Sequence, residues 1–509
     1  MGGFYLIKKG LLVSLVMLLA FLPVQMPNAS AEEQSQLQEE IVYYILVDRF
    51  NNGNFELDEA VDVENPKAYH GGDIPGITDR LNYLQEFGIT TIILSPIMKN
   101  APDGYHGYWV EDFYSIDEQF GTMEDLHELI DQAHEHDMKV VLELPINYIS
   151  ETHRIVEDPE KQDWITEVQM EEEGPDWLEK AVQLNHDVPE VQEELINVAD
   201  FWMNETDIDG FQLHGVDQAA PDFLIALSEH IKEKDPAFYL LGDVFLTSEE
   251  TEQLAETTAI DAIANEEVHE AMLRVFSEVD QPVSDIYEAW ENSSDKDGIL
   301  YVDDMYSKRF TQLFTENGRN YNTVWSLALT YMYTTPGVPV LFQGSEKAMY
   351  GETAEEAQRL VDFNSGDQEL QEFHDRISSL KAEFPALSYG DFELVGSSGA
   401  MSVFKRTYEE ETMFIAINNS STSEYVPITD LESGLQLRGY LGDNIVRENE
   451  KGEYRIGLPR ESADVYIIEE NQGLNWPLIG FAGAILLLFV LGVIYLTIKE
   501  KKREAEGKR

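Results

Sequence analysis

The 509-residue sequence contains no cysteine. Disulfide bonds, a thiol nucleophile and a zinc–thiolate centre are therefore excluded. Basic residues are also scarce, because 34 Lys and Arg stand against 97 Asp and Glu, which gives a formal net charge of −63. Such an excess of negative charge repels phosphate backbones and anionic lipid head groups. We therefore expect no nucleic-acid partner and a strongly solvated acidic surface.

Two apolar runs lie near the ends of the chain. The first follows two lysines and leads to the small residues ASA, which together form the three-part pattern of a secretory signal peptide over 1–31. The second, 478–498, has 21 residues without a charge, and the basic tail 499–509 follows it. A buried core helix is the alternative for this second run. The patterns predict a single-pass cell-membrane protein with one transmembrane helix, a large extracellular part and a cytoplasmic C-terminus.

Short apolar runs rich in β-branched and aromatic residues alternate with longer amphipathic stretches over the first two thirds of the sequence. Parallel strands that are buried on both faces have this appearance. Eight such runs predict a closed (β/α)8 barrel of the TIM type. The runs are 41–47, 89–95, 138–144, 208–213, 237–243, 259–265, 298–304 and 337–344.

Two regions depart from this alternation. The acidic stretch 149–184 is too long for a simple loop, so we expect a small insertion subdomain after the third strand, over the barrel mouth. The later part of the chain, 386–470, shows short alternating strands with turn signals, which predicts an antiparallel β domain. The predicted organisation is therefore a barrel over 32–385, the β domain, and a short polar tether, 471–477, before the second apolar run.

Polar side chains follow several of the expected strands. In barrels of this type, functional groups lie at the C-terminal ends of the strands. Asp243 ends the fifth run, Asp303 and Asp304 end the seventh, and the aromatic motif YHGYW occupies 105–109. Two carboxyl groups beside aromatic faces can cleave a glycosidic bond, because one protonates the leaving oxygen while the other attacks the sugar or activates water.

Six longer motifs carry a resemblance to a known family. Their content and their order resemble the alpha-amylase family of glycoside hydrolases, over about 41 to 470 of this chain. The resemblance implies the barrel and the C-terminal β domain, and it implies action on alpha-linked glucans. The motifs are YYILVDRF, GGDIPGITDRLNYLQEFGITTIILSPI, YHGYWVEDFY, FGTMEDLHELIDQAHEHDMKVVLELPINY, LNHDVPEVQEELINVADFW and TTPGVPVLFQGSE.

The resemblance also places the family's catalytic residues, and all three positions differ from the family's pattern. His214 occupies the position of the nucleophilic Asp, and Asp243 occupies the position of the acid/base Glu. The position of the carboxylate that stabilises the transition state falls on Tyr306 or, with a gap, on Asp304 or Asp303.

The strand-three motif of the family has an Asp, an Asn and a His, which here read Glu143, Asn147 and Tyr148. An Arg of the strand-four motif is replaced by a glutamine, whereas the YHGYW motif is intact. The substrate-binding positions that the resemblance implies are His106, Tyr108, Trp109, Tyr148 and Gln212.

Loss of a nucleophile usually lowers a rate by several powers of ten. We therefore expect a membrane-anchored protein with impaired catalysis, which binds alpha-glucans or maltooligosaccharides or serves as a scaffold for a membrane-protein partner. The alternative is an active hydrolase or transglycosidase that cleaves alpha-1,4-glucans at the cell surface. A role of His214 as a metal ligand or base, and recruitment of another carboxylate such as Asp217, remain open.

The loop NNGNFELD at 51–58, together with GGD at 71–73, resembles a calcium-binding loop found in part of the family. Hard cations prefer oxygen ligands of this kind. A polar turn built from Asn and Gly is the alternative. At the family's other calcium position, Gln183 replaces a carboxylate, so no second calcium ion is expected. The candidate calcium ligands are Asn52, Asn54, Asp58, the carbonyl of Gly71, and Asp73.

Overall fold

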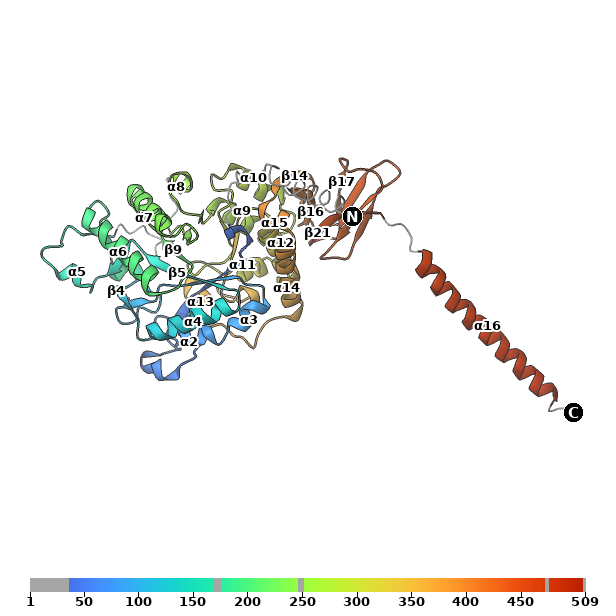
Figure 1. The fold of residues 1–509 in the computed structure, drawn as a ribbon, viewed down its shortest axis with the longest axis horizontal. Helices are drawn as coiled ribbons and strands as arrows, with labels where there is room; N and C mark the ends of the chain where they lie inside the picture. Colours follow the sequence, from blue (N-terminus) through green and yellow to red (C-terminus); the bar gives the residue numbers. More distant parts are fainter. Residues whose placement is uncertain (1–35, 169–174, 246–250, 472–475, 507–509) are drawn as a thin grey trace, which may run out of the picture.

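The computed structural model describes residues 36–168, 175–245, 251–471 and 476–506. Figure 1 shows a barrel domain, a smaller β domain beside it, and a long C-terminal helix. The signal segment predicted over 1–31 lies outside the described residues.

Eight parallel strands form one sheet, in the order β11-β10-β9-β5-β2-β1-β13-β12. A parallel bridge between Ala264 and Ile299 joins the two ends of the sheet, so the predicted (β/α)8 barrel is confirmed. Six strands lie within a predicted apolar run, and β5 and β9 each extend one residue beyond theirs. The strands are β1 (Val42–Ile45), β2 (Thr91–Leu94), β5 (Lys139–Pro145), β9 (Gly210–His214), β10 (Tyr239–Gly242), β11 (Ala262–Ile263), β12 (Ile299–Leu300) and β13 (Val338–Phe342).

Side chains that alternate along the strands divide the apolar core into two layers. Phe211 and Leu213 of β9 belong to the layer between the barrel and its helices. Tyr44 of β1 and Val141 of β5 belong to the layer inside the barrel. The helices around the barrel are α2 (Ile74–Thr78), α3 (Leu81–Glu86), α4 (Met123–Glu135), α6 (Pro189–Glu205), α7 (Pro221–Lys234), α8 (Thr251–Thr257), α9 (Glu266–Ser277), α10 (Ser284–Asn292), α11 (Phe310–Glu316), α12 (Tyr321–Thr334), α13 (Ala354–Ala357), α14 (Gln368–Glu383) and α15 (Pro385–Tyr389).

Two small sheets lie between barrel elements. The hairpin of β3 (Met98–Asn100) and β4 (Val110–Ile116) follows β2. The second sheet lies in the region of the expected insertion and contains β6 (Tyr148–Ser150), β8 (Ala181–Leu184) and β7 (Ile165–Thr166), in that order. The same region also contains α5 (Arg154–Glu157) and the short 3-10 helix η4 (Asp176–Lys180).

The C-terminal domain is antiparallel, as the alternation of its sequence predicts. Its six-stranded sheet has the order β14-β15-β16-β21-β18-β19, and β17 pairs with β20 beside it. The strands are β14 (Asp391–Ser398), β15 (Met401–Tyr408), β16 (Glu411–Asn418), β17 (Glu424–Ile428), β18 (Leu435–Gly439), β19 (Ile445–Arg447), β20 (Tyr454–Leu458) and β21 (Ser462–Glu470).

Buried polar side chains join the β domain to the barrel. The amide of Asn419 donates to three backbone carbonyls, those of Val275, Glu278 and Gln281, at 2.8–3.0 Å. Arg406, which is fully buried, donates to the carbonyl of Thr334 at 3.1 Å. Side chains of the β domain therefore donate hydrogen bonds to backbone carbonyls of the barrel.

The apolar run 478–498 lies within the long helix α16 (Trp476–Glu506). Over the described residues, no helix is both long enough and apolar enough to cross a membrane. The predicted transmembrane helix is therefore wrong, and so are the single-pass cell-membrane localisation and the membrane contact that depended on it. The run 478–498 is one part of a 31-residue helix that continues without a break into the charged residues after it, and the prediction was based on the hydropathy of this run alone.

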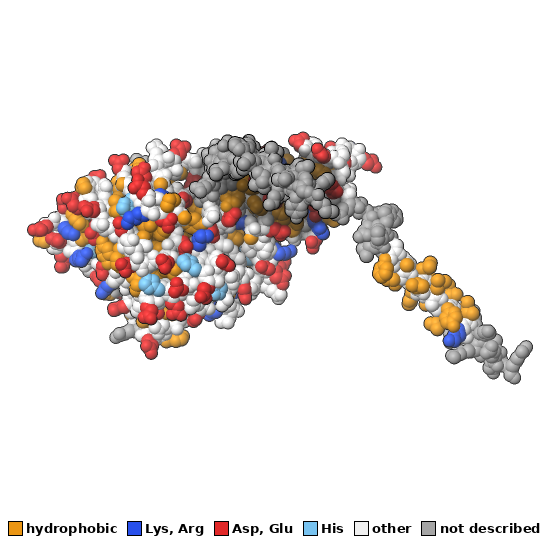
Figure 2. Space-filling model, viewed as in Figure 1, with side chains coloured by type: hydrophobic (Ala, Val, Ile, Leu, Met, Phe, Trp, Pro, Cys, Tyr) orange, Lys and Arg blue, Asp and Glu red, His pale blue; other side chains and the backbone are white. Residues whose placement is uncertain are grey.

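Acidic side chains are spread over the face of the molecule shown in Figure 2, with few basic side chains among them. This distribution agrees with the expectation of an acidic, solvated surface.

Candidate functional site

A histidine and two carboxylates meet at the C-terminal end of the barrel. Glu143 of β5 lies opposite Gln212 of β9 in the strand register, His214 is the last residue of β9, and Asp243 follows β10 directly. The Nδ1 atom of His214 lies 2.9 Å from Oδ2 of Asp243 and 3.1 Å from Oε1 of Glu143. We call these three residues the Glu143–His214–Asp243 triad.

The backbone around His214 fixes this arrangement. Gly215 has a φ of 65°, in the left-handed region that favours glycine, and its N–H donates to Oδ1 of Asp243. The side-chain amide of Asn147 donates to the carbonyls of His214 and Gly215, both at 2.8 Å. The turn after β9 therefore holds both His214 and Asp243 in place.

Three tyrosines surround Glu143, whose side chain is fully buried. The hydroxyl of Tyr108 donates to Oε1 of Glu143 at 2.8 Å, and the hydroxyl of Tyr44 donates to Oε2. Tyr306 in turn donates to the hydroxyl of Tyr108 at 2.9 Å. Both oxygens of Glu143 are therefore occupied by protein groups.

The charges of the triad depend on one another. Burial alone would lower the pKa of His214, but the adjacent Asp243 and Glu143 outweigh burial and raise this pKa to about 10. Burial raises the pKa of Glu143, and the contact with His214 opposes that rise. In the absence of a bound cation, His214 is therefore an imidazolium between two carboxyl groups at neutral pH.

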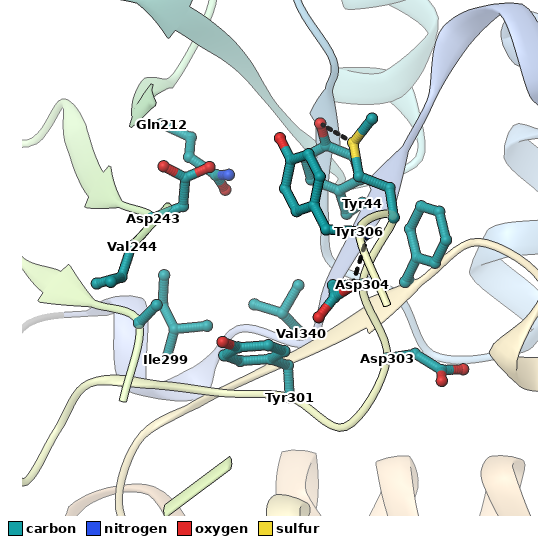
Figure 3. A pocket seen from close by; sticks show the side chains of 13 residues that line it. Tyr44, Gln212, Asp243, Val244, Ile299, Tyr301, Asp303, Asp304, Tyr306 and Val340 are labelled. Carbon is teal, nitrogen blue, oxygen red and sulfur yellow. Dashed lines mark hydrogen bonds between the residues drawn. The ribbon is translucent and has the colours of Figure 1, made fainter. Parts of the chain in front are cut away.

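A cavity of about 100 Å³, which we call the inner cavity, opens beside the triad. In Figure 3, Gln212 and Asp243 lie on one wall of this cavity, and Tyr44 and Tyr306 lie on the opposite wall. Asp243 is the member of the triad that lines the cavity, and its side chain is 21% exposed.

The two aspartates after β12 differ in their contacts. Oδ1 of Asp304 accepts the backbone N–H of Tyr306 at 2.7 Å, which turns the chain so that Tyr306 reaches the tyrosine network (Figure 3). Asp303 is instead engaged by Arg309 at 3.2 Å and by the hydroxyl of Ser345 at 2.7 Å. Tyr306, rather than either aspartate, is therefore the strand-seven residue that joins the hydrogen-bond network around Glu143.

The aromatic motif at 105–109 is covered by an aromatic residue of η4. The ring of Trp177 stacks on Tyr108, with ring centroids 4.7 Å apart, and Trp109 donates its indole N–H to the carbonyl of Trp177 at 2.7 Å. Two further predicted binding residues, His106 and Tyr148, also contact Trp177 and are buried, whereas Gln212 lines the cavity beside the triad. Tyr108 is buried, so its ring is covered by the protein itself.

Outside this aromatic cluster, a groove of about 560 Å³ runs over the barrel mouth. We call it the outer groove. It shares Tyr306 with the inner cavity, and both Trp109 and Trp177 line it. Its other aromatic residues are Tyr105 and Phe245.

The candidate calcium loop brings together only part of its predicted ligands. Asn52 donates to Asp58 at 2.9 Å, its Oδ1 atom is buried without a hydrogen-bond partner, and both side chains lie beside Gly71. Asp73, however, accepts the backbone N–H groups of Gly53, Asn54 and Gly76 and caps α2. Asn54 caps the following turn through the N–H of Glu56. The unpaired oxygen of Asn52 fits a cation, whereas Asp73 and Asn54 already have structural partners.

Two residues of the site are absent from the sequence-based predictions. Tyr44 lies on the inward face of β1, and its position could have been found from the period-two alternation of that strand. Trp177 lies in the acidic insertion, where no periodic pattern distinguishes it from a surface aromatic residue.

Comparisons with known proteins agree with this architecture. The family described as "Alpha amylase, catalytic domain" matches residues 44–181 and 176–382, and "Alpha-amylase C-terminal domain" matches residues 390–466. A cyclomaltodextrinase from Thermoanaerobacter pseudethanolicus is 25% identical over 426 residues, which cover 77% of this chain and 72% of the relative.

Two solved structures are more similar in sequence. An alpha-amylase from Anoxybacillus is 37% identical, with a TM-score of 0.80, over 86% of this chain and 99% of that chain. An alpha-amylase from Geobacillus thermoleovorans, solved in complex with acarbose, is 36% identical, with a TM-score of 0.78, over the same shares of the two chains. Since the catalytic-domain match alone covers more than half of the sequence, this chain belongs to the alpha-amylase family.

Proposed function

We propose that this protein binds alpha-linked glucooligosaccharides at the barrel mouth without hydrolysing them by the family's retaining reaction. The observation that carries the proposal is the enclosure of His214, at the position of the nucleophile, by Glu143 and Asp243. A retaining glycosidase needs two carboxyl groups about 5 to 5.5 Å apart, one of which attacks the anomeric carbon.

None of the triad's groups is available for that attack. Both oxygens of Glu143 accept hydrogen bonds, and both oxygens of Asp243 face donors on His214 and Gly215. An imidazolium has no lone pair to offer, and Nδ1 of His214 is the atom that both carboxylates contact. The arrangement therefore favours a stable, paired site over a reacting one.

The outer groove is the place where we expect the sugar. Aromatic side chains bind sugar rings by stacking, and Trp177, Phe245 and Tyr306 line the groove together. The similar alpha-amylase from Geobacillus thermoleovorans was solved with acarbose, which supports a ligand of the same carbohydrate class here.

The test is a pair of measurements on the full chain with maltopentaose. We expect the sugar to raise the melting temperature, because a ligand that binds only the folded state stabilises it, and we expect no reducing ends beyond a blank. Trp177→Ala should weaken the sugar-dependent shift. Tyr425→Ala is the control, because Tyr425 is an exposed aromatic residue of the C-terminal domain, outside the groove. Absence of a sugar-dependent shift would contradict the proposal and favour the scaffold role.

An active alpha-glucan hydrolase or transglycosidase is the second candidate. It is favoured by the 37% identity to an alpha-amylase and by Asp243, which lines the inner cavity and to which the sequence resemblance assigns the acid/base position. Release of reducing ends by the unmodified chain, abolished by Asp243→Asn, would establish this candidate and overturn the first.

We also propose calcium as a ligand of the loop at 51–58. Asn52 and Asp58 would hold the ion together with the carbonyl of Gly71, and the bound ion would stabilise the loop against unfolding. The buried and unpaired Oδ1 atom of Asn52 supports this assignment. A calcium-dependent rise in melting temperature, absent from Asp58→Ala, is the expected result.

A further inference from the structure

The triad has the composition of a metal site that the family resemblance does not include. One imidazole and two carboxylates each offer a ligand atom, and these three atoms lie within 4.8 Å of one another. We propose that Glu143, His214 and Asp243 form a binding site for a first-row divalent cation such as Zn²⁺ or Mn²⁺. This inference is independent of the proposed sugar binding.

The distances within the triad suit such an ion. Metal–ligand bonds of about 2.0–2.2 Å place neighbouring ligand atoms about 3 Å apart in an octahedral site and about 3.4 Å apart in a tetrahedral Zn²⁺ site. The two contacts of His214 Nδ1, at 2.9 and 3.1 Å, match that spacing. Imidazole and carboxylate together suit Zn²⁺ or Mn²⁺, whereas Ca²⁺ prefers oxygen ligands alone.

Charge also favours a divalent ion over a proton. Two ionised carboxylates and a neutral imidazole carry a charge of about −2, and a proton on the ring leaves about −1 in a buried place, where unpaired charge is costly. A divalent ion neutralises the site completely. Among the described residues, no Lys or Arg side chain forms an ion pair with Glu143 or Asp243, so no basic side chain neutralises these two carboxylates.

The surroundings orient the ligands as metal sites require. Groups that hydrogen-bond to ligating carboxylates fix their geometry, and their loss commonly weakens metal binding about 10- to 100-fold. Tyr44 and Tyr108 hold Glu143 in this way, and the N–H of Gly215 holds Asp243. Asp243 lines the inner cavity, which gives an ion a path to the two buried ligands.

Titration of the chelator-treated full chain with Co²⁺ and Zn²⁺, in excess calcium, tests the proposal. Calcium occupies the oxygen-only sites that so acidic a surface offers, and the visible spectrum of bound Co²⁺ reports ligation by nitrogen. We expect one equivalent of Co²⁺ to bind with a spectrum that includes a nitrogen ligand. His214→Gln should weaken binding more than about 10-fold.

The control variant is His230→Gln. His230 lies 2.8 Å from Asp200 on the surface, so it repeats one histidine–carboxylate contact without the second carboxylate. It should leave Co²⁺ binding unchanged. Tyr44→Phe keeps every ligand and should weaken Co²⁺ binding about 10-fold. This variant provides a second test if the His214→Gln chain does not fold. Absence of saturable binding, or binding that survives His214→Gln with an unchanged spectrum, would overturn the proposal.

Discussion

Replacement of His214 by glutamine tests whether the buried charges of the triad depend on that one ring. His214→Gln removes the cation that faces Glu143, whose side chain has 0% exposure, and Asp243, whose side chain is 21% exposed. Removal of one partner of a buried ion pair typically costs about 3–5 kcal/mol, because it leaves an uncompensated charge. We expect a loss of that size in the free energy of unfolding, measured in urea at pH 7 with chelator present.

The matched variant is again His230→Gln. The His230 and Asp200 side chains are 33% and 26% exposed, so this surface contact should be worth about 0–1 kcal/mol. A second replacement, Glu143→Gln in the His214→Gln background, should recover most of the loss, because a neutral amide remains at the buried position. Equal losses for the two histidine variants, or no recovery in the double variant, would refute the electrostatic reasoning.

Three further outcomes are expected. Lys381 is buried without a hydrogen-bond partner among the described residues, and burial lowers its pKa to about 7. Since the unfolded chain binds the proton more tightly between about pH 7 and 10.5, stability should rise with pH across that window, and Lys381→Met should stabilise the protein by about 2–4 kcal/mol at pH 7 but little at pH 10.5; an equal gain at both would contradict this. Trp177→Ala should lower the free energy of unfolding by about 3–5 kcal/mol, since Trp177 is a buried stacked ring, and a loss below about 1 kcal/mol in urea would be inconsistent with the packing. Calcium added to the chelator-treated chain should raise the melting temperature of the unmodified protein but not of Asp58→Ala; an equal rise in both would place the calcium ion elsewhere.

The barrel could be predicted because each of its strands is buried on both faces. Such strands are continuous apolar runs, and the order of the runs along the chain gives the order of the strands in a parallel sheet. The eight runs match the eight strands to within one residue at their C-terminal ends for that reason, or contain them completely. At the C-terminus, the transmembrane helix predicted from hydropathy alone was wrong, because an apolar run in the sequence does not show where its helix begins and ends. There, α16 passes through 478–498 and includes the charged residues beyond it.

The candidate site was only partly predictable. His214 and Asp243 could be predicted from the strand ends, since His214 directly follows an apolar run and Asp243 is the last residue of one. The contact between them depends on the left-handed turn at Gly215 and on the amide of Asn147, which lies on a different strand end. The placement of Trp177 over Tyr108 depends on the path of a long insertion, for which no local pattern exists. Pairwise contacts across loops of this length are set by tertiary packing rather than by sequence periodicity.

The hydrogen bonds of Asn419 bear on how this protein can be divided. Its amide contacts the carbonyl of Val275 near the end of α9 and two carbonyls just after this helix. A barrel expressed without the β domain would lose these hydrogen bonds and the one from Arg406 to Thr334, although Glu278 would keep Arg319 as a donor. An intramolecular hydrogen bond that water replaces contributes about 0.5–1.5 kcal/mol. A truncation at the boundary near residue 386 would therefore remove part of the barrel's own stability. We therefore expect the barrel to be most stable when it is expressed together with the β domain, even though their sequences match two separate family descriptions.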